Sequence, residues 1–134
     1  MVLVDSDVWS EAFRKRGRNS QAVSLLEKFI ENDEVIMIGT VRQEVLSGIK
    51  DDKQFEKIRD ILKAFPSQLL EDSIFELAAS FFNACRRNGI QGSHTDFLLC
   101  ACGVAWKAKI LTKDKDFQRF SNYIPIELVG LKVL

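Results

Sequence analysis

The chain has 134 residues, of which 46% are hydrophobic and 28% are charged, an ordinary composition for one globular domain with its own core. Its 19 Lys and Arg balance its 19 Asp and Glu, so the net charge gives no overall attraction to nucleic acid. Any contact to phosphate would have to come from a local basic patch or a metal ion. No apolar run approaches the roughly 18 residues of a membrane span and no signal peptide is recognisable, so we expect a cytoplasmic protein without membrane contact.

A short apolar run over 1–4 opens the chain and leads directly into the acids Asp5 and Asp7. A continuous apolar run of this kind predicts a strand that is buried on both faces. A carboxylate is costly inside such a strand, so Asp5 is expected at its carboxyl end, where open parallel α/β sheets bind ligands. We therefore interpret Asp5 as the first ligand of a metal site.

Helices and strands then alternate along the chain. The first half predicts a helix from about Val8 capped by Ser6 or Asp7, an amphipathic helix over 22–30, a buried strand over 35–38 and a helix opened by a capping box of Thr40 and Gln43. The next part of the chain predicts a helix from Asp51 or Asp52 to Phe65, an extended link over 67–70 and an amphipathic helix over 74–85. It is followed by a helix from His94 to about Lys107 that Ser93 caps. The last part predicts a strand over 110–112, helical turns within 113–120 and a last strand over 126–129. This alternation favours a three-layer α/β/α sandwich around a mainly parallel sheet of four to five strands, as a single domain over residues 1–134.

Carboxylates from separate segments are expected to meet at one edge of this sheet. In a parallel sheet the helix after each strand starts at that strand's carboxyl end, so strand ends and helix N-termini share an edge. Asp5 leaves the first strand, Glu44 lies about one turn into the helix after the second, and Asp96 is in the first turn of the helix before the third. The third strand ends in Thr112, and Asp114 and Asp116 follow it.

Such a cluster is typical of a site for a divalent cation. Carboxylates in one cleft repel each other and burial penalises their charged forms, so some of their pKa values rise unless a cation is bound. Oxygen-only ligands suit the hard cations Mg²⁺ and Mn²⁺. The candidate metal ligands and catalytic residues are Asp5, Glu44, Asp96 and Asp114, with Asp116 as an alternative to Asp114.

Each acid also has a purely structural interpretation. Asp96 can favour the N-terminus of its own helix, and Glu44 can pair with a surface arginine. Asp7 fits a helix cap better than a metal ligand. One of Asp114 and Asp116 can cap the short helix that follows them.

Four motifs occur in a fixed order. They are a strand that ends in Asp and Ser at Val4–Ser6, a Glu within the helix of Val41–Gly48, an Asp that opens a late helix at Thr95–Leu99, and a Thr-x-Asp-x-Asp-Phe segment within Leu111–Phe117. This ordered set resembles the PIN-domain ribonucleases, and specifically the VapC-type toxins of toxin–antitoxin pairs. Asp7 departs from the pattern, because Ser or Asn is more usual there, and it places an extra acid near the site.

The resemblance implies a PIN-like fold and a metal-dependent endoribonuclease that is the toxin of a type II toxin–antitoxin pair. The four candidate ligands would hold one or two Mg²⁺ or Mn²⁺ ions, and a metal-activated water would cleave RNA to leave a 5′-phosphate and a 3′-hydroxyl. Ser6 and Thr112 would orient the carboxylates or the water. The resemblance also implies a homodimer, an RNA substrate and inhibition by a cognate antitoxin.

Two surface features bear on these partners. Arg14, Lys15, Arg16 and Arg18 form the densest basic cluster and are candidate contacts to the RNA backbone, although a solvated helix end explains them equally well. The only histidine, His94, is expected as a solvated residue at a helix start, with an RNA contact as the alternative. A second apolar stripe on the long helix predicts a surface for a second subunit or an antitoxin helix, formed by Phe75, Ala79 and Phe82.

Two other functions stay open from the sequence. A haloacid-dehalogenase-type phosphatase would use Asp5 as its nucleophile, because Asp5-Ser6-Asp7 after a strand resembles the Asp-x-Asp start of that class. That interpretation leaves Glu44 and Asp96 unexplained. A non-catalytic PIN-like binding module would keep the fold, and its acids would bind a regulatory cation or none.

Overall fold

Three short parallel strands lie at the centre of the computed structural model, which describes residues 1–14 and 20–131. They are β1 (Val2–Val4), β2 (Val35–Ile36) and β3 (Lys109–Leu111), in the order β2-β1-β3. Val2 pairs with Val35 on one side and with Lys109 on the other. Because β1 is the middle strand, all three of its residues are buried, as its apolar sequence predicts.

Helices connect and cover these strands. In the described part of the chain they are α1 (Ser6–Ala12), α2 (Gln21–Glu31), α3 (Gly39–Leu46), α4 (Asp52–Leu62), α5 (Asp72–Arg87), α6 (His94–Ala105) and α7 (Asp116–Phe120). Side chains that accept a backbone N–H bond cap the starts of α1, α2, α4 and α6, and these caps are Asp5, Ser20, Asp51 and Ser93.

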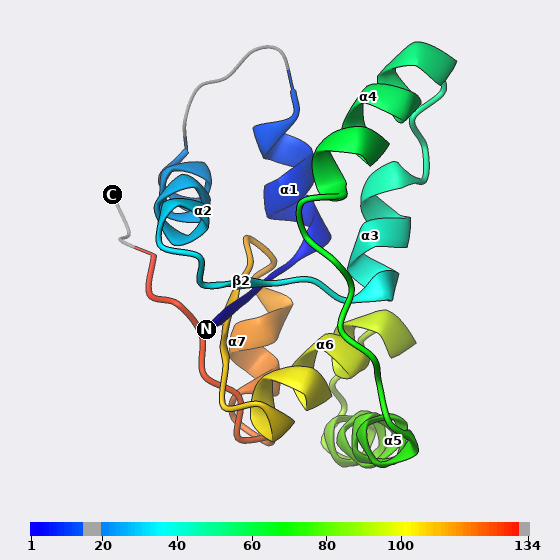
Figure 1. The fold of residues 1–134 in the computed structure, drawn as a ribbon. Helices are drawn as coiled ribbons and strands as arrows, with labels where there is room; N and C mark the ends of the chain where they lie inside the picture. Colours follow the sequence, from blue (N-terminus) through cyan, green and yellow to red (C-terminus); the bar gives the residue numbers. More distant parts are fainter. Residues whose placement is uncertain (15–19, 132–134) are drawn as a thin grey trace.

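The helices form layers on both sides of the sheet (Figure 1). α1 and α2 lie on one side and α5 and α6 on the opposite side, while α3 and α4 stand beside α1. α2 packs against β2, whereas α6 packs against both β1 and β3. The expected α/β/α arrangement around a parallel sheet is therefore confirmed.

The sheet is smaller than the predicted four to five strands, with three strands in the described residues. The expected second strand stops at Ile36, because α3 already begins at Gly39. Met37 then makes one isolated parallel bridge to Ser67. The expected last strand over 126–129 is likewise reduced to one isolated bridge to β3. This segment follows Pro125, which has no N–H to add to a ladder.

α6 is buried on nearly all sides. Every residue from Phe97 to Gly103 is buried, which fits a helix that is apolar all round and lies between two layers. A Cβ atom added at Gly103 would lie 3.2 Å from the carbonyl oxygen of Ala108 and from the side chain of Ile110, so this glycine allows close packing of α6 on the start of β3. Burial of α6 fixes the position of its first turn, which carries Asp96.

The predicted starts of two helices were wrong. The cap of α1 is Asp5 and not Ser6 or Asp7. The cap of α3 is Ile38, which makes no side-chain cap bond, so the capping box expected from Thr40 is absent. The hydroxyl of Thr40 is instead buried without a hydrogen-bond partner. In both cases the chain enters the helix earlier than the local sequence signals indicate.

The end of α6 also differs from the prediction, because the helix stops at Ala105 and not at about Lys107. Lys107 has a φ of 53°, in the left-handed region, and this conformation ends the helix and turns the chain into β3.

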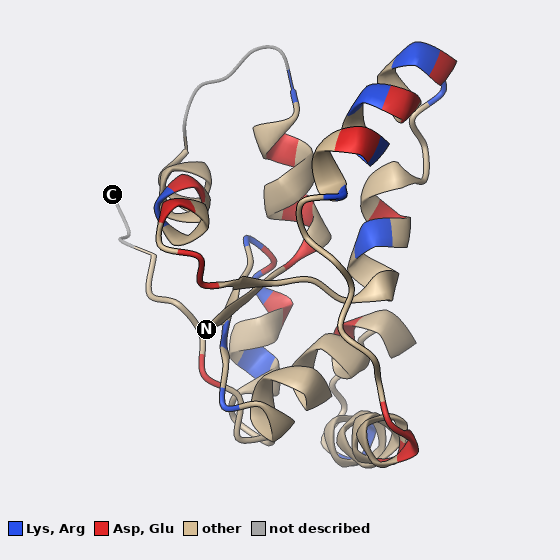
Figure 2. Cartoon of the chain, viewed as in Figure 1, with Lys and Arg blue, Asp and Glu red and all other residues tan. Residues whose placement is uncertain are grey.

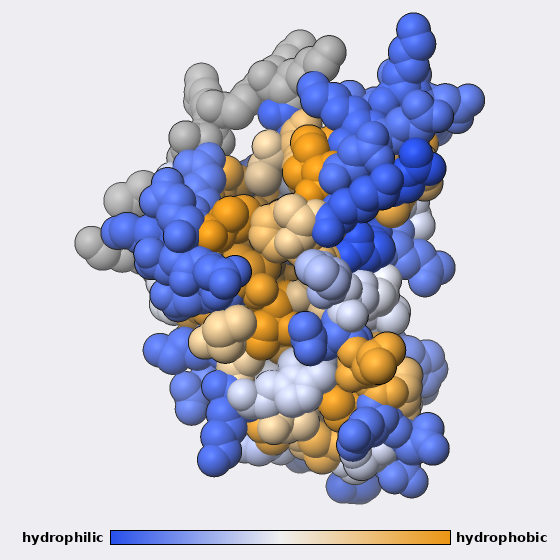
Figure 3. Space-filling model, viewed as in Figure 1, coloured by the Kyte–Doolittle hydropathy of each residue, from blue (hydrophilic) through white to orange (hydrophobic). Residues whose placement is uncertain are grey.

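The molecular surface alternates between charged helices and an apolar band (Figure 3). On the face shown, the band runs between the hydrophilic outer sides of α2 and α4. Leu69, in the link between α4 and α5, is 92% exposed and is the most exposed large apolar side chain of the described residues. No helix in the described ranges is long and apolar enough to cross a membrane.

Candidate active site

Asp5 lies directly after β1 and is only 8% exposed. Its Oδ1 accepts a hydrogen bond from the backbone N–H of Ser6 at 2.8 Å, and its Oδ2 accepts one from the hydroxyl of Thr112 at 2.8 Å. Thr112 directly follows β3 and is also buried. The ends of two neighbouring strands therefore fix this carboxylate, which cannot turn away without breaking bonds to both.

Asp7 ties α1 to the loop after β3. Its Oδ2 accepts a hydrogen bond from the backbone N–H of Lys113 at 3.0 Å, and the Lys113 ammonium pairs with Glu11 Oε2 at 2.7 Å. The other carboxylate oxygen of Asp7 is buried without a hydrogen-bond partner. The interpretation of Asp7 as a helix cap was therefore wrong, because this residue braces the loop that carries Asp114.

That loop is held by a short chain of hydrogen bonds. The Thr112 hydroxyl accepts a bond from the N–H of Asp114 at 3.0 Å, and Asp114 Oδ1 accepts one from the N–H of Asp116 at 2.9 Å. Asp114 thus helps to open α7, and Thr112 positions both Asp5 and the backbone of Asp114. Asp116 lies 4.0 Å from Arg119 in an exposed ion pair.

Asp96 and Glu44 approach from the other side. Asp96 forms a capping box with Ser93, in which Asp96 Oδ2 accepts the Ser93 N–H at 3.2 Å and Ser93 Oγ accepts the Asp96 N–H at 3.1 Å. Glu44 Oε2 accepts a hydrogen bond from the Thr95 hydroxyl at 3.3 Å, so Glu44 faces α6 and not a surface arginine. The capping role expected as an alternative for Asp96 is present, and it leaves one carboxylate oxygen outside the box.

The acids come from separate segments and share one region beyond the carboxyl ends of the strands. Figure 2 shows acidic residues at the start of α1, at the start of α6 and in the segment before α7. They are close enough to influence one another, because Asp96 and Asp7 raise the pKa of Asp5, and Asp114 raises that of Asp96. These couplings place Asp5, Asp7, Asp96 and Asp114 within electrostatic range of one another.

Burial is the main cause of the perturbed pKa values. It raises the pKa of Asp5 from 3.8 to about 7, with repulsion from Asp7 adding to the rise and the Thr112 and Ser6 hydrogen bonds opposing it. Burial likewise raises the pKa values of Asp7, Glu44 and Asp96. A positive charge placed between these carboxylates would oppose the rise in their pKa values.

The donor set fits a hard divalent cation. It consists only of carboxylate and hydroxyl oxygens, which Mg²⁺ and Mn²⁺ prefer. Among the described residues, no three His, Cys, Asp or Glu side chains are already arranged to hold a metal ion.

Arg14, Arg42 and His94 take no part in the side-chain hydrogen bonds that hold the acids of the site. Arg14 is exposed, and Lys15, Arg16 and Arg18 are outside the described residues. Arg42, within the same motif as Glu44, bonds the hydroxyl of Ser67 and the carbonyl oxygens of Leu62 and Phe65, and so fastens α3 to the end of α4. His94 is exposed, as expected, and its ring stacks on Phe82 with 4.8 Å between the centroids.

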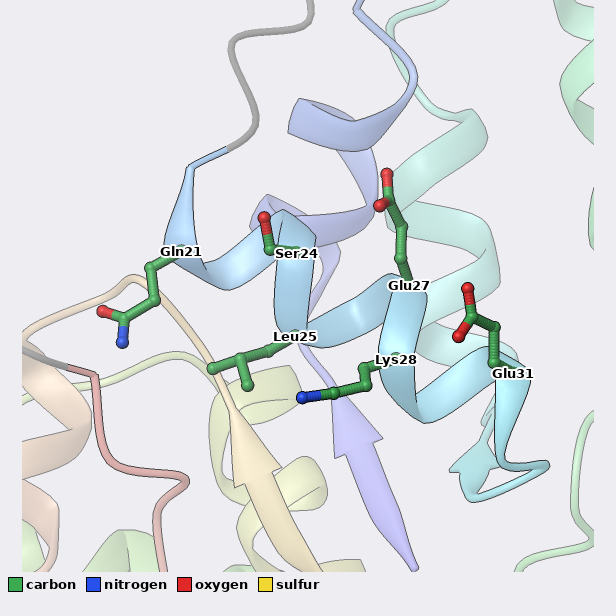
Figure 4. Close-up of a pocket in the computed structure, with 6 residues that line it drawn as sticks. All are labelled: Gln21, Ser24, Leu25, Glu27, Lys28 and Glu31. Atoms are coloured by element: carbon green, nitrogen blue, oxygen red, sulfur yellow. The ribbon is translucent and has the colours of Figure 1, made fainter.

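A separate hollow lies on the surface of α2 (Figure 4). The described residues that line it come only from this helix, and they are Gln21, Ser24, Leu25, Glu27, Lys28 and Glu31. It shares no residue with the acidic region, so it is not part of the candidate active site.

Sequence reasoning missed two features of the site. Thr95 had no assigned role, although a hydroxyl in the first turn of α6 beside Asp96 is well placed to bond a carboxylate. The Lys113–Glu11 ion pair was also missed, and no local signal could have revealed it because the partners are 102 positions apart.

An α/β protein with acids gathered at the carboxyl edge of a parallel sheet is the class that the fold and the site define. The family model described as the PIN domain matches residues 2–123, so the chain belongs to the PIN-domain family. Ribonuclease VapC11 of Mycobacterium tuberculosis and VapC ribonuclease Mb1587 of Mycobacterium bovis are each 31% identical to it over 136 residues, which cover 98% of this chain and 100% of each relative. The resemblance drawn from the four motifs is thereby confirmed.

Solved structures support the fold independently of close sequence similarity. VapBC2 from Rickettsia felis, bound to a DNA fragment from their promoter, matches with a TM-score of 0.79 at 16% identity, covering 98% of this chain and 100% of that chain. FitAcB from Neisseria gonorrhoeae matches with a TM-score of 0.77 at 16% identity and covers 97% of each chain.

Proposed function

We propose that this PIN-domain protein is a metal-dependent endoribonuclease and the toxin of a type II toxin–antitoxin pair. The observation that carries the proposal is the burial of Asp5 between the ends of β1 and β3, within reach of the charges of Asp7 and Asp96. A group that is costly to bury and held by two hydrogen bonds is suited to a functional role. The ribonuclease names of the relatives at 31% identity support the same reaction.

Asp5, Glu44, Asp96 and Asp114 are the residues that would hold Mg²⁺ or Mn²⁺, with Asp116 as a further candidate. A bound cation of this kind neutralises phosphate charge and lowers the pKa of water, which favours hydrolysis of a phosphodiester. The products expected are a 5′-phosphate and a 3′-hydroxyl.

The protein's own hydroxyl groups orient these carboxylates. Thr112 donates to Asp5 and accepts the N–H of Asp114, so one side chain sets the positions of two candidate ligands. Thr95 donates to Glu44, and hydrogen bonding from Thr95 and Ser6 opposes the rise that burial causes in the pKa of Glu44. Such supporting hydrogen bonds keep ligand geometry within the narrow range that catalysis needs.

The proposed partners follow from the same relatives. We expect an RNA substrate, a homodimer and a cognate antitoxin, since VapC-named proteins are the similar ribonucleases and a VapBC2 structure shares the fold. Arg14 stays a candidate contact to the RNA backbone. Family membership leaves the haloacid-dehalogenase-type alternative without support, while a non-catalytic PIN-like module is separated from the ribonuclease by the experiment below.

The test is incubation of the purified full-length protein with structured RNA, in Mn²⁺ or in EDTA. We expect cleavage in Mn²⁺ alone, with 5′-phosphate and 3′-hydroxyl ends, and a loss of about 100-fold or more in Asp5→Asn and in Asp96→Asn. Asp60→Asn is the matched control, because Asp60 is an exposed carboxylate in α4 that pairs with Lys63.

Three outcomes would contradict parts of this proposal. Cleavage that is unaffected by Asp96→Asn would overturn the site assignment. Turnover of a phosphomonoester through an aspartyl-phosphate would favour the phosphatase. A stably folded protein that cleaves no RNA at any Mn²⁺ concentration would favour the non-catalytic module.

A further inference from the structure

A pocket of about 430 Å³ opens beside the acidic region, where the loop after β3 meets the C-terminal segment. One wall is formed by residues 112–115 and by Gln118 of α7, and the other wall is formed by residues 128–131. The volume lies within the range of about 300–1,000 Å³ that is usual for ligand sites. Thr112 and Asp114 line the pocket and also belong to the candidate active site, so a molecule in the pocket lies against a candidate metal ligand.

Four charged residues follow one another over 113–116, and three of them already have a partner. The ammonium of Lys113 lies 2.7 Å from Glu11 Oε2. Asp114 Oδ1 accepts the backbone N–H of Asp116 at 2.9 Å, and the carboxylate of Asp116 lies 4.0 Å from Arg119. These three side chains are therefore engaged within the protein.

The fourth charge is that of Lys115. Its side chain is exposed, lines the pocket and forms no hydrogen bond or ion pair with any residue that the structure describes. Gln118, one turn further along, is also exposed and adds an amide group to the same wall. An ammonium group binds phosphate as a point charge, so an unpaired lysine needs no fixed geometry to bind one.

The opposite wall of the pocket is apolar. Leu128, Val129 and Leu131 are half-buried there. This wall is held to the sheet, because the N–H of Val129 donates to the carbonyl oxygen of Ile110 in β3 at 2.9 Å. The pocket thus has a cation on one side and apolar surface on the other, which matches a nucleotide with its phosphate on one side and its sugar and base on the other.

An RNA chain needs positive charge on this side of the acids. A divalent cation neutralises charge at the phosphate that it binds, but the neighbouring phosphates approach the same carboxylates without a cation of their own. A lysine next to the carboxylates lowers that repulsion. Lys113 and Lys115 flank Asp114 in the chain, and of these two lysines Lys115 is the one without a partner in the described residues.

We propose that this pocket binds the RNA nucleotide next to the cleaved phosphodiester, with the phosphate of that nucleotide against the ammonium of Lys115. The inference deepens the ribonuclease function proposed above and rests on it. An RNA chain at the candidate metal ligands runs directly on into the pocket, because Thr112 and Asp114 belong to both. A separate acidic peptide lacks that continuity and is repelled by the acids. Lys115 is accordingly a substrate-binding residue.

The test is RNA binding by the full-length protein, measured by fluorescence anisotropy in Ca²⁺ so that affinity is obtained whether or not the RNA is cleaved. The probes are a single-stranded oligonucleotide and versions of it in which an uncharged methylphosphonate replaces one phosphate at a time. In the wild type we expect one position at which loss of the charge weakens binding by about 3–10-fold, the size of one partly exposed charge-assisted contact. In Lys115→Ala that penalty should disappear, while the penalties at other positions stay unchanged.

Salt dependence supplies an independent measure. Each phosphate contact to a single strand contributes about 0.7 to the slope of log affinity against log salt concentration. Lys115→Ala should therefore reduce the magnitude of that slope by about 0.7, for RNA of any sequence. Lys115→Arg keeps the charge and should keep both the slope and the penalty. Because the side chain is exposed and unpaired in the described structure, neither change should alter folding.

Lys109→Ala is the matched control. Lys109 is an exposed lysine at the opposite end of β3 and lies outside this pocket, so its removal should leave the slope and every penalty unchanged. Equal slopes and equal penalties in the wild type and in Lys115→Ala would overturn the proposal. A polyglutamate peptide that binds the wild type but not Lys115→Ala, with no position-specific phosphate penalty, would assign the pocket to an acidic protein partner instead.

The failures of the two proposals look different. Failure of the ribonuclease proposal appears as no cleavage of any RNA in Mn²⁺, whatever the binding data. Failure of the pocket appears as affinity that does not depend on Lys115, including the absence of any binding. Where the RNA is cleaved, the phosphate that responds to Lys115→Ala should lie next to the cleaved bond, and a distant phosphate would also overturn the inference.

Discussion

The two ends of α6 serve opposite purposes. The first turn carries Asp96 and Thr95, which face other polar groups, and the pKa of Asp96 is raised by burial. The following turns, from Phe97 to Gly103, are buried against β1, β3 and α5 with apolar side chains. The apolar turns stabilise the fold by burial, whereas burial of the first turn penalises the charged form of Asp96. The packed turns therefore hold in place a first turn whose carboxylate is penalised by burial.

The largest expected effect comes from the packed end. Leu99→Ala, at a side chain that is 2% exposed, should lower the free energy of unfolding by about 2–5 kcal/mol, because it leaves a cavity between layers. Urea denaturation measures this loss. RNA cleavage per folded molecule should stay near the wild-type value at low temperature. A fall in cleavage without a fall in stability would break the division between the two ends.

A bound divalent cation should offset the loss of stability that comes from burying the carboxylates near the first turn of α6. Bound at about 100 times its dissociation constant, Mn²⁺ should raise the free energy of unfolding by about 2.7 kcal/mol, because it binds the folded site and relieves repulsion. Thermal denaturation with and without EDTA measures the gain. Asp96→Asn should reduce it, and a gain of equal size in that variant would place the cation elsewhere.

The hydroxyl of Thr112 sharpens the comparison within the site. Thr112→Val keeps the shape but removes the donor to Asp5 and the acceptor for Asp114, so kcat/KM for RNA cleavage should fall by about 10–100-fold. Thr112→Ser keeps the hydroxyl and should retain most of the activity. Equal activity of the Val and Ser variants would show that orientation of Asp5 does not depend on this bond.

The smallest expected effect concerns pH. The pKa of Asp5 is about 7 in the folded protein and 3.8 as its ordinary value, so the folded state binds the proton more tightly. This group therefore stabilises the fold least above pH 7, and its contribution falls as the pH rises from about 4 to about 7. In EDTA at pH 7.5, Asp5→Asn should raise the free energy of unfolding by about 1–2 kcal/mol, and the gain should be small at pH 4.

Melting curves of the wild type and of Asp5→Asn at both pH values measure this difference. A variant that is less stable than the wild type at pH 7.5 would show that the hydrogen bonds from Thr112 and Ser6 outweigh burial. That result would place Asp5 with the residues that stabilise the fold.

The sequence by itself determined the order of the elements and the acids that belong together. Continuous apolar runs and a 3.6-residue period of apolar residues specify strands and helices locally, and a carboxylate that follows a buried strand is expected at the carboxyl end of that strand. Asp5, Glu44, Asp96 and Asp114 could be chosen on these grounds. The predicted number of strands was too high, because an apolar run does not show how many backbone hydrogen bonds a neighbour supplies.

Only the tertiary structure decided how those acids are held. The bond between Asp7 and Lys113 spans 106 positions and that between Thr95 and Glu44 spans 51, so neither has a local signal. The pocket beside Lys115 likewise needs the loop after β3 and the C-terminal segment to meet. The physical reason is that a hydrogen bond forms only when its donor and acceptor are placed to within a few tenths of an ångström. The packing of α6 against the sheet sets these distances, whereas the pattern of residues along the chain does not.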